Sequence, residues 1–316
     1  MHASPRRDFL KTAGALSLSA LGAAAFPVRP AGAIEPIRRN GTPKFKFSLA
    51  AYSYRELLTT TRNGKSVPGK RGNLTLEDFI ADCAKFQLDA TELTSYYFPA
   101  DTTPEYLRSL ASLCFKLGLD VSGTAVGNDL THPKGPQRDE QIALVKRWVD
   151  NSAVLGAPVI RIFSGNVKSG QTEAEAHRLA VEGIEECCDY AGKHGVFLAL
   201  ENHGGLTERP EGLLKLVRDV NSPWFGVNFD SGNFHSSDPY ADLEQIAPYA
   251  INAQVKVVVT RGDRKTTKKE PSDLKRLASM LRNANYRGYI TLEFEEDEDP
   301  REACPRYLDQ LRAAFA

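Results

Sequence analysis

The sequence predicts a single (β/α)8 TIM barrel, an α/β fold in which parallel strands alternate with helices around a closed ring. Short runs with strand composition alternate with helical patterns eight times, which indicates parallel strands joined by crossover helices. Eight such units occupy about 270 residues, the usual size of this fold. The rival is a doubly wound open sheet, which usually carries a glycine-rich phosphate turn. Neither G-x-G-x-x-G nor G-x-x-x-x-G-K-S/T occurs in the chain.

Eight segments have the composition of buried strands and are bounded by turn residues. They are residues 45–52, 89–93, 120–125, 158–163, 196–201, 225–230, 252–258 and 289–294.

Apolar residues recur at spacings of three and four between these segments, which predicts amphipathic helices. Thr75 precedes the first repeat and is placed as an N-cap. Gly118 and Gly156 follow the second and third repeats, where a helix commonly ends in a left-handed residue. The repeats cover residues 76–86, 107–117, 142–155, 179–190, 213–217, 274–281 and 308–315.

Residues 1–33 are predicted to be a signal peptide of the twin-arginine type. Arg6 and Arg7 precede an apolar run over residues 13–26, and a small-x-small cleavage site ends at Ala33. The string Arg-Arg-x-Phe-Leu-Lys resembles the twin-arginine export signal, so we expect a periplasmic or otherwise extracytoplasmic protein. An uncleaved membrane anchor is the alternative. The apolar run is short for a membrane span, and we expect no stable span after cleavage.

The remaining chain is predicted to consist of a polar lead-in over residues 34–44 and the barrel over residues 45–316. Forty basic and forty acidic residues cancel, so the composition gives no nucleic-acid footprint. We interpret the five cysteines as small core residues, with a single disulfide as the alternative. Homo-oligomerisation is left open by the sequence.

Two long loops, residues 55–73 and 260–271, follow the first and the seventh predicted strands. Both are basic, and both leave the strand ends at which barrels of this kind build their sites. They are interpreted either as covers for an anionic substrate or as solvated, mobile loops.

Polar residues stand at the carboxyl ends of four successive strands and predict one shared site. They are Glu201, Asp230, Gln254 and Glu293, from the fifth to the eighth strand. Three carboxylates in one apolar funnel repel each other unless protons or a cation intervene. A divalent ion held by oxygen ligands is the simplest solution. His203 lies beyond the end of the fifth strand and His235 beyond that of the sixth. Both are available as ligands or substrate contacts.

Each of these residues also has a structural alternative. A strand-end carboxylate such as Asp230 can cap the following helix, and His203 or His235 can be a hydrogen-bonded structural histidine. Gln254 can satisfy backbone groups, and the long side chain of Lys256 can extend to the rim of the barrel.

The order of the strand-end motifs resembles the xylose isomerase-like TIM barrels, the group of sugar phosphate isomerases and epimerases. The motifs are E-N-H after strand five, F-D-x-G-N-x-H after strand six, polar-x-Lys on strand seven and L-E-x-E on strand eight. The resemblance implies a divalent metal ion, Mn²⁺ or Mg²⁺ first and Co²⁺ or Zn²⁺ as alternatives. Its ligands would be Glu201, Asp230 and Glu293, with Gln254 where the family has histidine. Because an amide binds transition metals less well than imidazole, the site would favour Mg²⁺ or Mn²⁺, bind weakly, or have lost its metal.

The resemblance further implies a sugar isomerase or epimerase that removes a proton next to a carbonyl group. Glu201 and Glu293 would carry the proton, Lys256 and Arg161 would anchor substrate oxygens, and Glu92 would orient a hydroxyl group or a ligand. The expected partner is a free or keto sugar rather than nucleic acid, because exported enzymes rarely meet phosphorylated metabolites. A lyase or hydratase of 3-keto-glycosides, which shares the first step, and a non-catalytic sugar-binding barrel are the alternatives.

Overall fold

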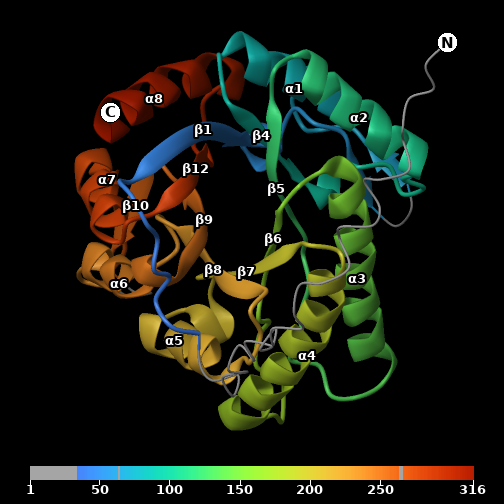
Figure 1. Ribbon diagram of the computed structural model, residues 1–316, viewed down its shortest axis with the longest axis vertical. Helices are drawn as coiled ribbons and strands as arrows, with labels where there is room; N and C mark the ends of the chain where they lie inside the picture. Colours follow the sequence, from blue (N-terminus) through green and yellow to red (C-terminus); the bar gives the residue numbers. More distant parts are fainter. Residues whose placement is uncertain (1–33, 63–64, 263–265) are drawn as a thin grey trace, which may run out of the picture. The chain divides into compact units, whose positions relative to one another are not determined.

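Eight parallel strands close into a barrel in the computed structural model, which describes residues 34–62, 65–262 and 266–316. The order around the ring is β1-β12-β9-β8-β7-β6-β5-β4 (Figure 1), and the predicted (β/α)8 fold is confirmed. Residues 1–33 lie outside this description, so the signal peptide stays a prediction. The barrel strands are β1 (Lys44–Ala50), β4 (Ala90–Thr94), β5 (Asp120–Ala125), β6 (Val159–Ile162), β7 (Phe197–Glu201), β8 (Phe225–Asp230), β9 (Ala250–Val255) and β12 (Arg287–Leu292).

Helices surround the ring of strands (Figure 1). They are α1 (Leu76–Lys85), α2 (Pro104–Lys116), α3 (Pro136–Leu155), α4 (Glu173–Lys193), α5 (Pro210–Asp219), α6 (Pro239–Ile246), α7 (Leu274–Asn283) and α8 (Pro300–Phe315). Seven of them coincide with predicted repeats. The exception is α6, whose eight residues bury only Pro239, Tyr240, Leu243 and Ile246 and so offer too short a repeat to stand out.

The two long loops contain short antiparallel hairpins rather than irregular chain alone. The first carries β2 (Thr60–Arg62) and β3 (Lys65–Val67), and the second carries β10 (Val258–Arg261) and β11 (Lys268–Pro271). The predicted seventh strand, residues 252–258, ends earlier than expected because β9 stops at Val255 and β10 begins three residues later. Short 3-10 turns complete the connections: η1 (Ala51–Tyr54), η2 (Ser95–Tyr97), η3 (Gly205–Thr207) and η4 (Ala247–Tyr249).

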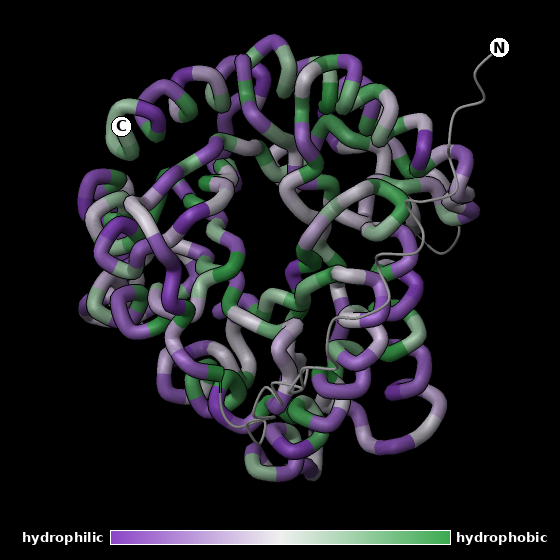
Figure 2. The backbone as a smooth tube through the Cα atoms, viewed as in Figure 1, coloured by the Kyte–Doolittle hydropathy of each residue, from purple (hydrophilic) through white to green (hydrophobic). Residues whose placement is uncertain are grey.

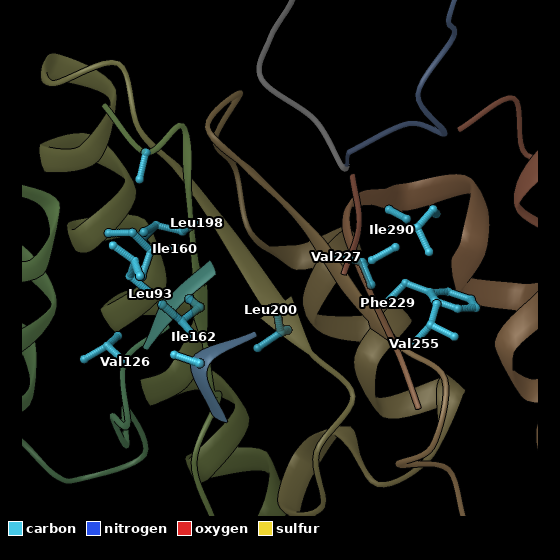
Figure 3. Close-up of a cluster of buried hydrophobic side chains, with 14 of the residues drawn as sticks. Leu93, Val126, Ile160, Ile162, Leu198, Leu200, Val227, Phe229, Val255 and Ile290 are labelled. Atoms are coloured by element: carbon cyan, nitrogen blue, oxygen red, sulfur yellow. The ribbon is translucent and has the colours of Figure 1, made fainter. Parts of the chain in front are cut away.

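Alternate residues of each strand point to opposite faces, and here the two faces differ sharply in polarity. Figure 3 shows buried apolar side chains from successive strands, which belong to the core shared with the helices. They include Leu93, Ile160, Ile162, Leu198, Leu200, Val227, Phe229, Val255 and Ile290, none of them more than 1% exposed. Several of the intervening positions hold buried polar residues, among them Glu92, Asn228, Asn252 and Gln254.

A hydrogen-bonded network of polar side chains crosses the interior of the barrel. Glu92 on β4 accepts from Asn252 at 3.1 Å and from Gln254 at 2.6 Å, both on β9. Asn228 on β8 donates to Gln254 at 2.6 Å and accepts from Asn252 at 2.8 Å. Because β4 and β9 are not neighbours in the ring, these bonds establish that all four side chains point inward.

The five cysteines are free and buried, which confirms their interpretation as core residues. The helical turns mix hydrophilic and hydrophobic residues along the trace (Figure 2), as amphipathic helices do. Within the described ranges, no helix has the length and apolar character that crossing a membrane requires.

Candidate functional site

The site lies where the strands end, at the rim formed by β7, β8, β9 and β12. Glu201 and Asp230 are the last residues of β7 and β8, and Lys256 and Glu293 directly follow β9 and β12. Their exposed fractions are 3%, 0%, 9% and 5% in that order. Strand ends far apart in the chain therefore bring three acids and a lysine into one buried cluster, as the sequence predicted for the acids.

Lys256 stands at the centre of this cluster and is surrounded by oxygen atoms. Its Nζ lies 2.9 Å from Oδ1 of Asn233, to which it donates a hydrogen bond. It lies 3.1 Å from Oε1 of Glu295, 3.2 Å from Oδ2 of Asp230 and 3.4 Å from Oε2 of Glu293. One ammonium group thus forms ion pairs with three carboxylates and a hydrogen bond to one amide oxygen.

Arg161 on β6 is the second buried cation, and it faces Glu201. Its Nε lies 2.8 Å from Oε2 of Glu201, and its Nη1 donates to the carbonyl oxygen of Val126 at 3.1 Å. Nε and Oε2 do not meet in hydrogen-bond geometry, and each is a buried polar atom without a hydrogen-bond partner in the described structure. The two atoms therefore form a close, buried ion pair.

Asn233 joins the two halves of the site. Its Nδ2 donates to Oε1 of Glu201 at 2.8 Å while its Oδ1 accepts from Lys256. Asn233 is the asparagine of the motif F-D-x-G-N-x-H, but no role in the site was predicted for it.

Burial raises the pKa of the site carboxyls into the range useful for proton transfer. The pKa of Glu201 rises to about 7 because burial penalises the charged form, an effect that Arg161 partly offsets. Burial also raises the pKa of Glu293 to about 7 and that of Asp230 to about 6, with Lys256 opposing the rise in each case. A carboxyl with a pKa near the working pH both accepts and donates a proton readily.

The pKa values of the two cations are also raised, but by neighbouring negative charge and against the effect of burial. Burial acts to lower the pKa of Lys256, but the charges of Asp230, Glu293 and Glu295 outweigh it and raise that pKa well above its ordinary value. Burial likewise acts to lower the pKa of Arg161, and the charge of Glu201 reverses the sign. Both groups stay positively charged at neutral pH.

Backbone contacts fix the strand ends that carry these side chains. The side chain of Asn202 holds the backbone of Asp230 from both sides: Nδ2 donates to its carbonyl oxygen at 2.9 Å, and Oδ1 accepts from its N–H at 3.0 Å. Oγ of Ser231 accepts from the N–H of Lys256 at 2.8 Å. The amide in E-N-H and the serine in F-D-S-G therefore serve to align neighbouring strands.

Glu92 and Gln254, two further predicted site residues, belong to the interior network below the rim. Burial raises the pKa of Glu92 to about 7, and the amides of Asn252 and Gln254 oppose the rise. Both amide atoms of Gln254 are engaged, the oxygen by Asn228 and the nitrogen by Glu92. Neither residue joins the cluster around Lys256.

His203 and His235 lie at the exposed margin of the site. The ring of His203 packs on Phe163, with centroids 4.6 Å apart, and the guanidinium of Arg161 lies 4.1 Å from the centroid of the same Phe163 ring. Burial and then the charge of Lys256 lower the pKa of both histidines. Both imidazoles are therefore neutral at neutral pH and within electrostatic range of the central ammonium.

The donor set does not fit a divalent metal ion as the side chains are arranged. Two of the four predicted ligands, Asp230 and Glu293, contact the ammonium of Lys256, and Glu201 contacts Arg161. The fourth, Gln254, has its oxygen occupied by Asn228. In the described parts of the chain, no group of three or more His, Cys, Asp and Glu side chains is arranged to hold a metal.

A cavity of about 570 Å³ is lined by residues of the loop that follows β1 and of the turn that follows β4. Three tyrosines, Tyr52, Tyr96 and Tyr97, line it together with Arg55 and residues of β2 and β3. Tyr96 interacts with the guanidinium of Arg161, and the pKa of Tyr52 is raised by burial and then by the charges at residues 295 and 293. The cavity is thus electrostatically coupled to the cluster.

A model of the xylose isomerase-like TIM barrel family matches residues 80–313. The chain belongs to this family. A curated protein, 3-dehydroshikimate dehydratase of Bacillus anthracis, is 22% identical over 152 residues, which are 47% of this chain and 52% of that protein. The chain therefore matches only about half the length of this curated relative.

Solved structures of family members share the fold at low sequence identity. D-psicose 3-epimerase from Clostridium cellulolyticum H10 is 15% identical, with a TM-score of 0.67 over 85% of this chain and 99% of the epimerase. A xylose isomerase-like TIM barrel protein from Mycobacterium smegmatis, solved in complex with magnesium, is 16% identical. Its TM-score is 0.63 over 86% of this chain and 98% of the other.

Proposed function

We propose that this xylose isomerase-like protein is an enzyme that removes a proton next to a carbonyl group of a keto sugar and returns it elsewhere. Return to the other face of the same carbon gives an epimer, and return to the neighbouring carbon gives an isomer. The observation that carries the proposal is the pair Glu201 and Glu293, two buried carboxyls with pKa values of about 7 at one rim of the barrel.

The step requires a base, an acid and positive charge near the carbonyl oxygen. As base, Glu201 takes the proton, and the C–H electron pair moves into the new C=C bond of an enediolate. The negative charge that forms on the former carbonyl oxygen is stabilised by the positive charges of Arg161 and Lys256. Glu293 in its protonated form then returns a proton to carbon. No part of this sequence is assigned to a metal, because the donor set does not fit one.

The tyrosine-lined cavity supports a sugar as the substrate. Aromatic rings and hydrogen-bonding side chains together suit the apolar faces and hydroxyl groups of a pyranose or furanose. We also propose export of the protein on the basis of residues 1–33, which makes free sugars, glycosides and their keto forms the accessible substrates. Similarity to epimerase structures is consistent with this substrate class.

Elimination is the second candidate reaction, and the similarity to 3-dehydroshikimate dehydratase favours it. The first step is the same proton abstraction, after which a leaving hydroxyl or glycosidic oxygen departs from the β-carbon with a proton from Glu293. A non-catalytic sugar-binding barrel remains the outcome if no chemistry is found.

Solvent deuterium exchange tests both reactions at once. We expect the protein in D₂O to incorporate deuterium at one carbon of a keto sugar, followed by NMR across a panel of ketoses and 3-keto-glycosides. Glu201→Gln and Glu293→Gln should each lower the exchange rate by at least about 100-fold, because positioned acid–base groups contribute roughly 10²- to 10⁴-fold.

Glu140→Gln is the matched control, because Glu140 is exposed on α3 and the same substitution there should leave exchange unchanged. Loss of a β-substituent together with exchange would identify the elimination. Binding of a sugar without any exchange over the panel would contradict the proposal and favour the non-catalytic barrel.

A further inference from the structure

We propose that the ammonium group of Lys256 is the resident cation of this site and occupies the place that a divalent metal would otherwise take. The inference deepens the proposed function and rests on it for its catalytic part. Its basis is the set of oxygens from Asn233, Glu295, Asp230 and Glu293, all within 3.4 Å of Nζ.

The distances are those of an ammonium and not of a metal. Nitrogen–oxygen separations of 2.9 to 3.4 Å match charge-assisted hydrogen bonds and close ion pairs. A divalent ion would need its oxygens at about 2.0 to 2.6 Å from one centre. With Nζ in position, a metal at that centre would overlap the ammonium and meet its positive charge. Lys256 therefore excludes the ion as well as replacing it.

The absence of a side chain at Gly232 leaves space for the aliphatic part of Lys256. A Cβ added at Gly232 would lie 2.6 Å from Cδ and 3.1 Å from Cβ of Lys256, so the lysine stem fills the space that the glycine leaves open. The N–H of Gly232 also donates to Oδ1 of Asp230 at 2.8 Å. The same glycine thus seats the lysine stem and orients one of the carboxylates that the ammonium contacts.

The position of Lys256 in its strand explains why it reaches the centre. Residues two apart in an extended chain point to the same face, so Lys256 follows Gln254 on the inner face and stands one step nearer the rim. Gln254 is held below by Asn228 and Glu92 and contributes its polar atoms to the interior network. An amide below and an ammonium above thus replace a metal-binding imidazole.

With an ammonium in place of a metal, the enediolate is stabilised in a different way from that in a metal-dependent enzyme. An ammonium donates hydrogen bonds to developing negative charge on oxygen but does not chelate two substrate oxygens as a metal does. The enzyme is therefore expected to work without added metal and to keep its exchange rate in a chelator.

Metal binding measured directly tests the inference without reference to turnover. Wild-type protein, stripped with a chelator and dialysed against Mn²⁺, is expected to retain well below one equivalent by elemental analysis. Lys256→Ala, which removes the ammonium and leaves three carboxylates, is expected to gain about one Mn²⁺ per chain and to be thermally stabilised by Mn²⁺. Lys256→Arg, which keeps the charge, is expected to bind no more than the wild type.

One equivalent of Mn²⁺ in the wild type, lost in Glu293→Gln, would overturn the inference. A folded Lys256→Ala that binds no more Mn²⁺ than the wild type would overturn it equally. If Lys256→Ala does not fold, the wild-type measurement decides alone. Absence of deuterium exchange in every keto sugar, by contrast, would count against the proposed function and leave the metal measurement untouched.

Discussion

At the scale of single residues, surroundings divide similar carboxyls into different roles. Glu92, Glu201 and Glu293 are all buried, and the pKa of each rises to about 7. Glu92 is held by two amides inside the ring, whereas Glu201 and Glu293 stand at strand ends beside cations. Of the three, Glu201 and Glu293 lie at the rim of the barrel, where their exposed fractions are 3% and 5%.

The raised carboxyl pKa predicts the acid side of the pH–rate profile. Glu201 must be deprotonated to act as the base and Glu293 protonated to act as the acid, so kcat/KM should be highest near pH 7. On the acid side it should fall with an apparent pKa near 7 as Glu201 becomes protonated. We expect a tenfold loss per pH unit well below that value. A profile flat down to about pH 5 would show that the base is a carboxyl with an ordinary pKa.

The sequence located the acids of the site but not their partners. Glu201, Asp230 and Glu293 were found because strand ends of a barrel converge, a rule that needs only strand positions. Asn233 and Glu295 stand in the motifs F-D-x-G-N-x-H and L-E-x-E, but no role was predicted for either, because both lie beyond the strands, where the chain path is not periodic. Glu295 could have been found from its place two residues after Glu293. Lys256 was predicted as a sugar anchor, since its residue type alone does not reveal the three carboxylates around it.

At the scale of elements, the cap at Thr75 explains why the start of α1 was predictable, whereas α4 begins at Glu173, before the predicted repeat over residues 179–190. Thr75 caps α1 and Thr172 caps α4, and both form a capping box with an acidic residue three positions later. Local signals of this kind do not depend on the rest of the fold. The hairpins β2–β3 and β10–β11 carry no such signal, because basic polar residues with few apolar positions read as loop.

Removal of one N-cap side chain should lower the free energy of unfolding by a measurable amount. Thr172 accepts from the N–H of Glu175 at 3.2 Å, and Glu175 accepts from the N–H of Thr172 at 2.9 Å. Thr172→Ala is therefore expected to lower the free energy of unfolding by about 1 kcal/mol in a denaturant titration.

Ser109→Ala is the matched control, because Ser109 is an exposed hydroxyl within α2 and caps no helix end. Its loss should stay within about 0.5 kcal/mol of the wild type. Equal effects of the two substitutions would contradict a specific role for the cap at Thr172.

At the scale of the whole molecule, the barrel has an unusual interior. Bulky branched residues commonly fill such rings, but here a network of Glu92, Asn228, Asn252 and Gln254 spans from β4 to β8 and β9. Polar groups so deeply buried are tolerated only when their hydrogen bonds are made. The network therefore specifies how the two sides of the ring face each other.

Breaking this network in the middle should destabilise the entire barrel. Asn228→Leu keeps the number and branching of the side-chain heavy atoms but leaves the oxygen of Gln254 without its donor and removes an acceptor of Asn252. We expect a loss of about 3 kcal/mol in the free energy of unfolding, as follows from buried polar groups left unsatisfied. Asn283→Leu, at an exposed position of α7, should change it by less than about 0.5 kcal/mol. A neutral Asn228→Leu would show that the network adds nothing to stability.

The sequence predicted the ring itself but not this interior. Eight strand–helix alternations were enough for the fold, and the outward apolar positions followed from composition. The inward asparagines were not identified, although Asn228 and Asn252 each lie two residues before a predicted site residue. Whether polar residues on the inner face bond to one another depends on which strands oppose each other across the ring, and that is not a local property.

The side chain of Arg55 connects the segment after the first barrel strand, β1, with the segment after the last, β12. The guanidinium of Arg55, in the loop after β1, donates to the backbone carbonyl oxygens of Phe294 at 3.0 Å and Glu295 at 2.5 Å. Arg55 also forms part of the wall of the tyrosine-lined cavity. Reshaping that wall to admit a different sugar would loosen the main chain that aims the carboxylate of Glu295 at Lys256. A substitution that changes the sugar preference through Arg55 is consequently expected to change the charge environment of Lys256 as well.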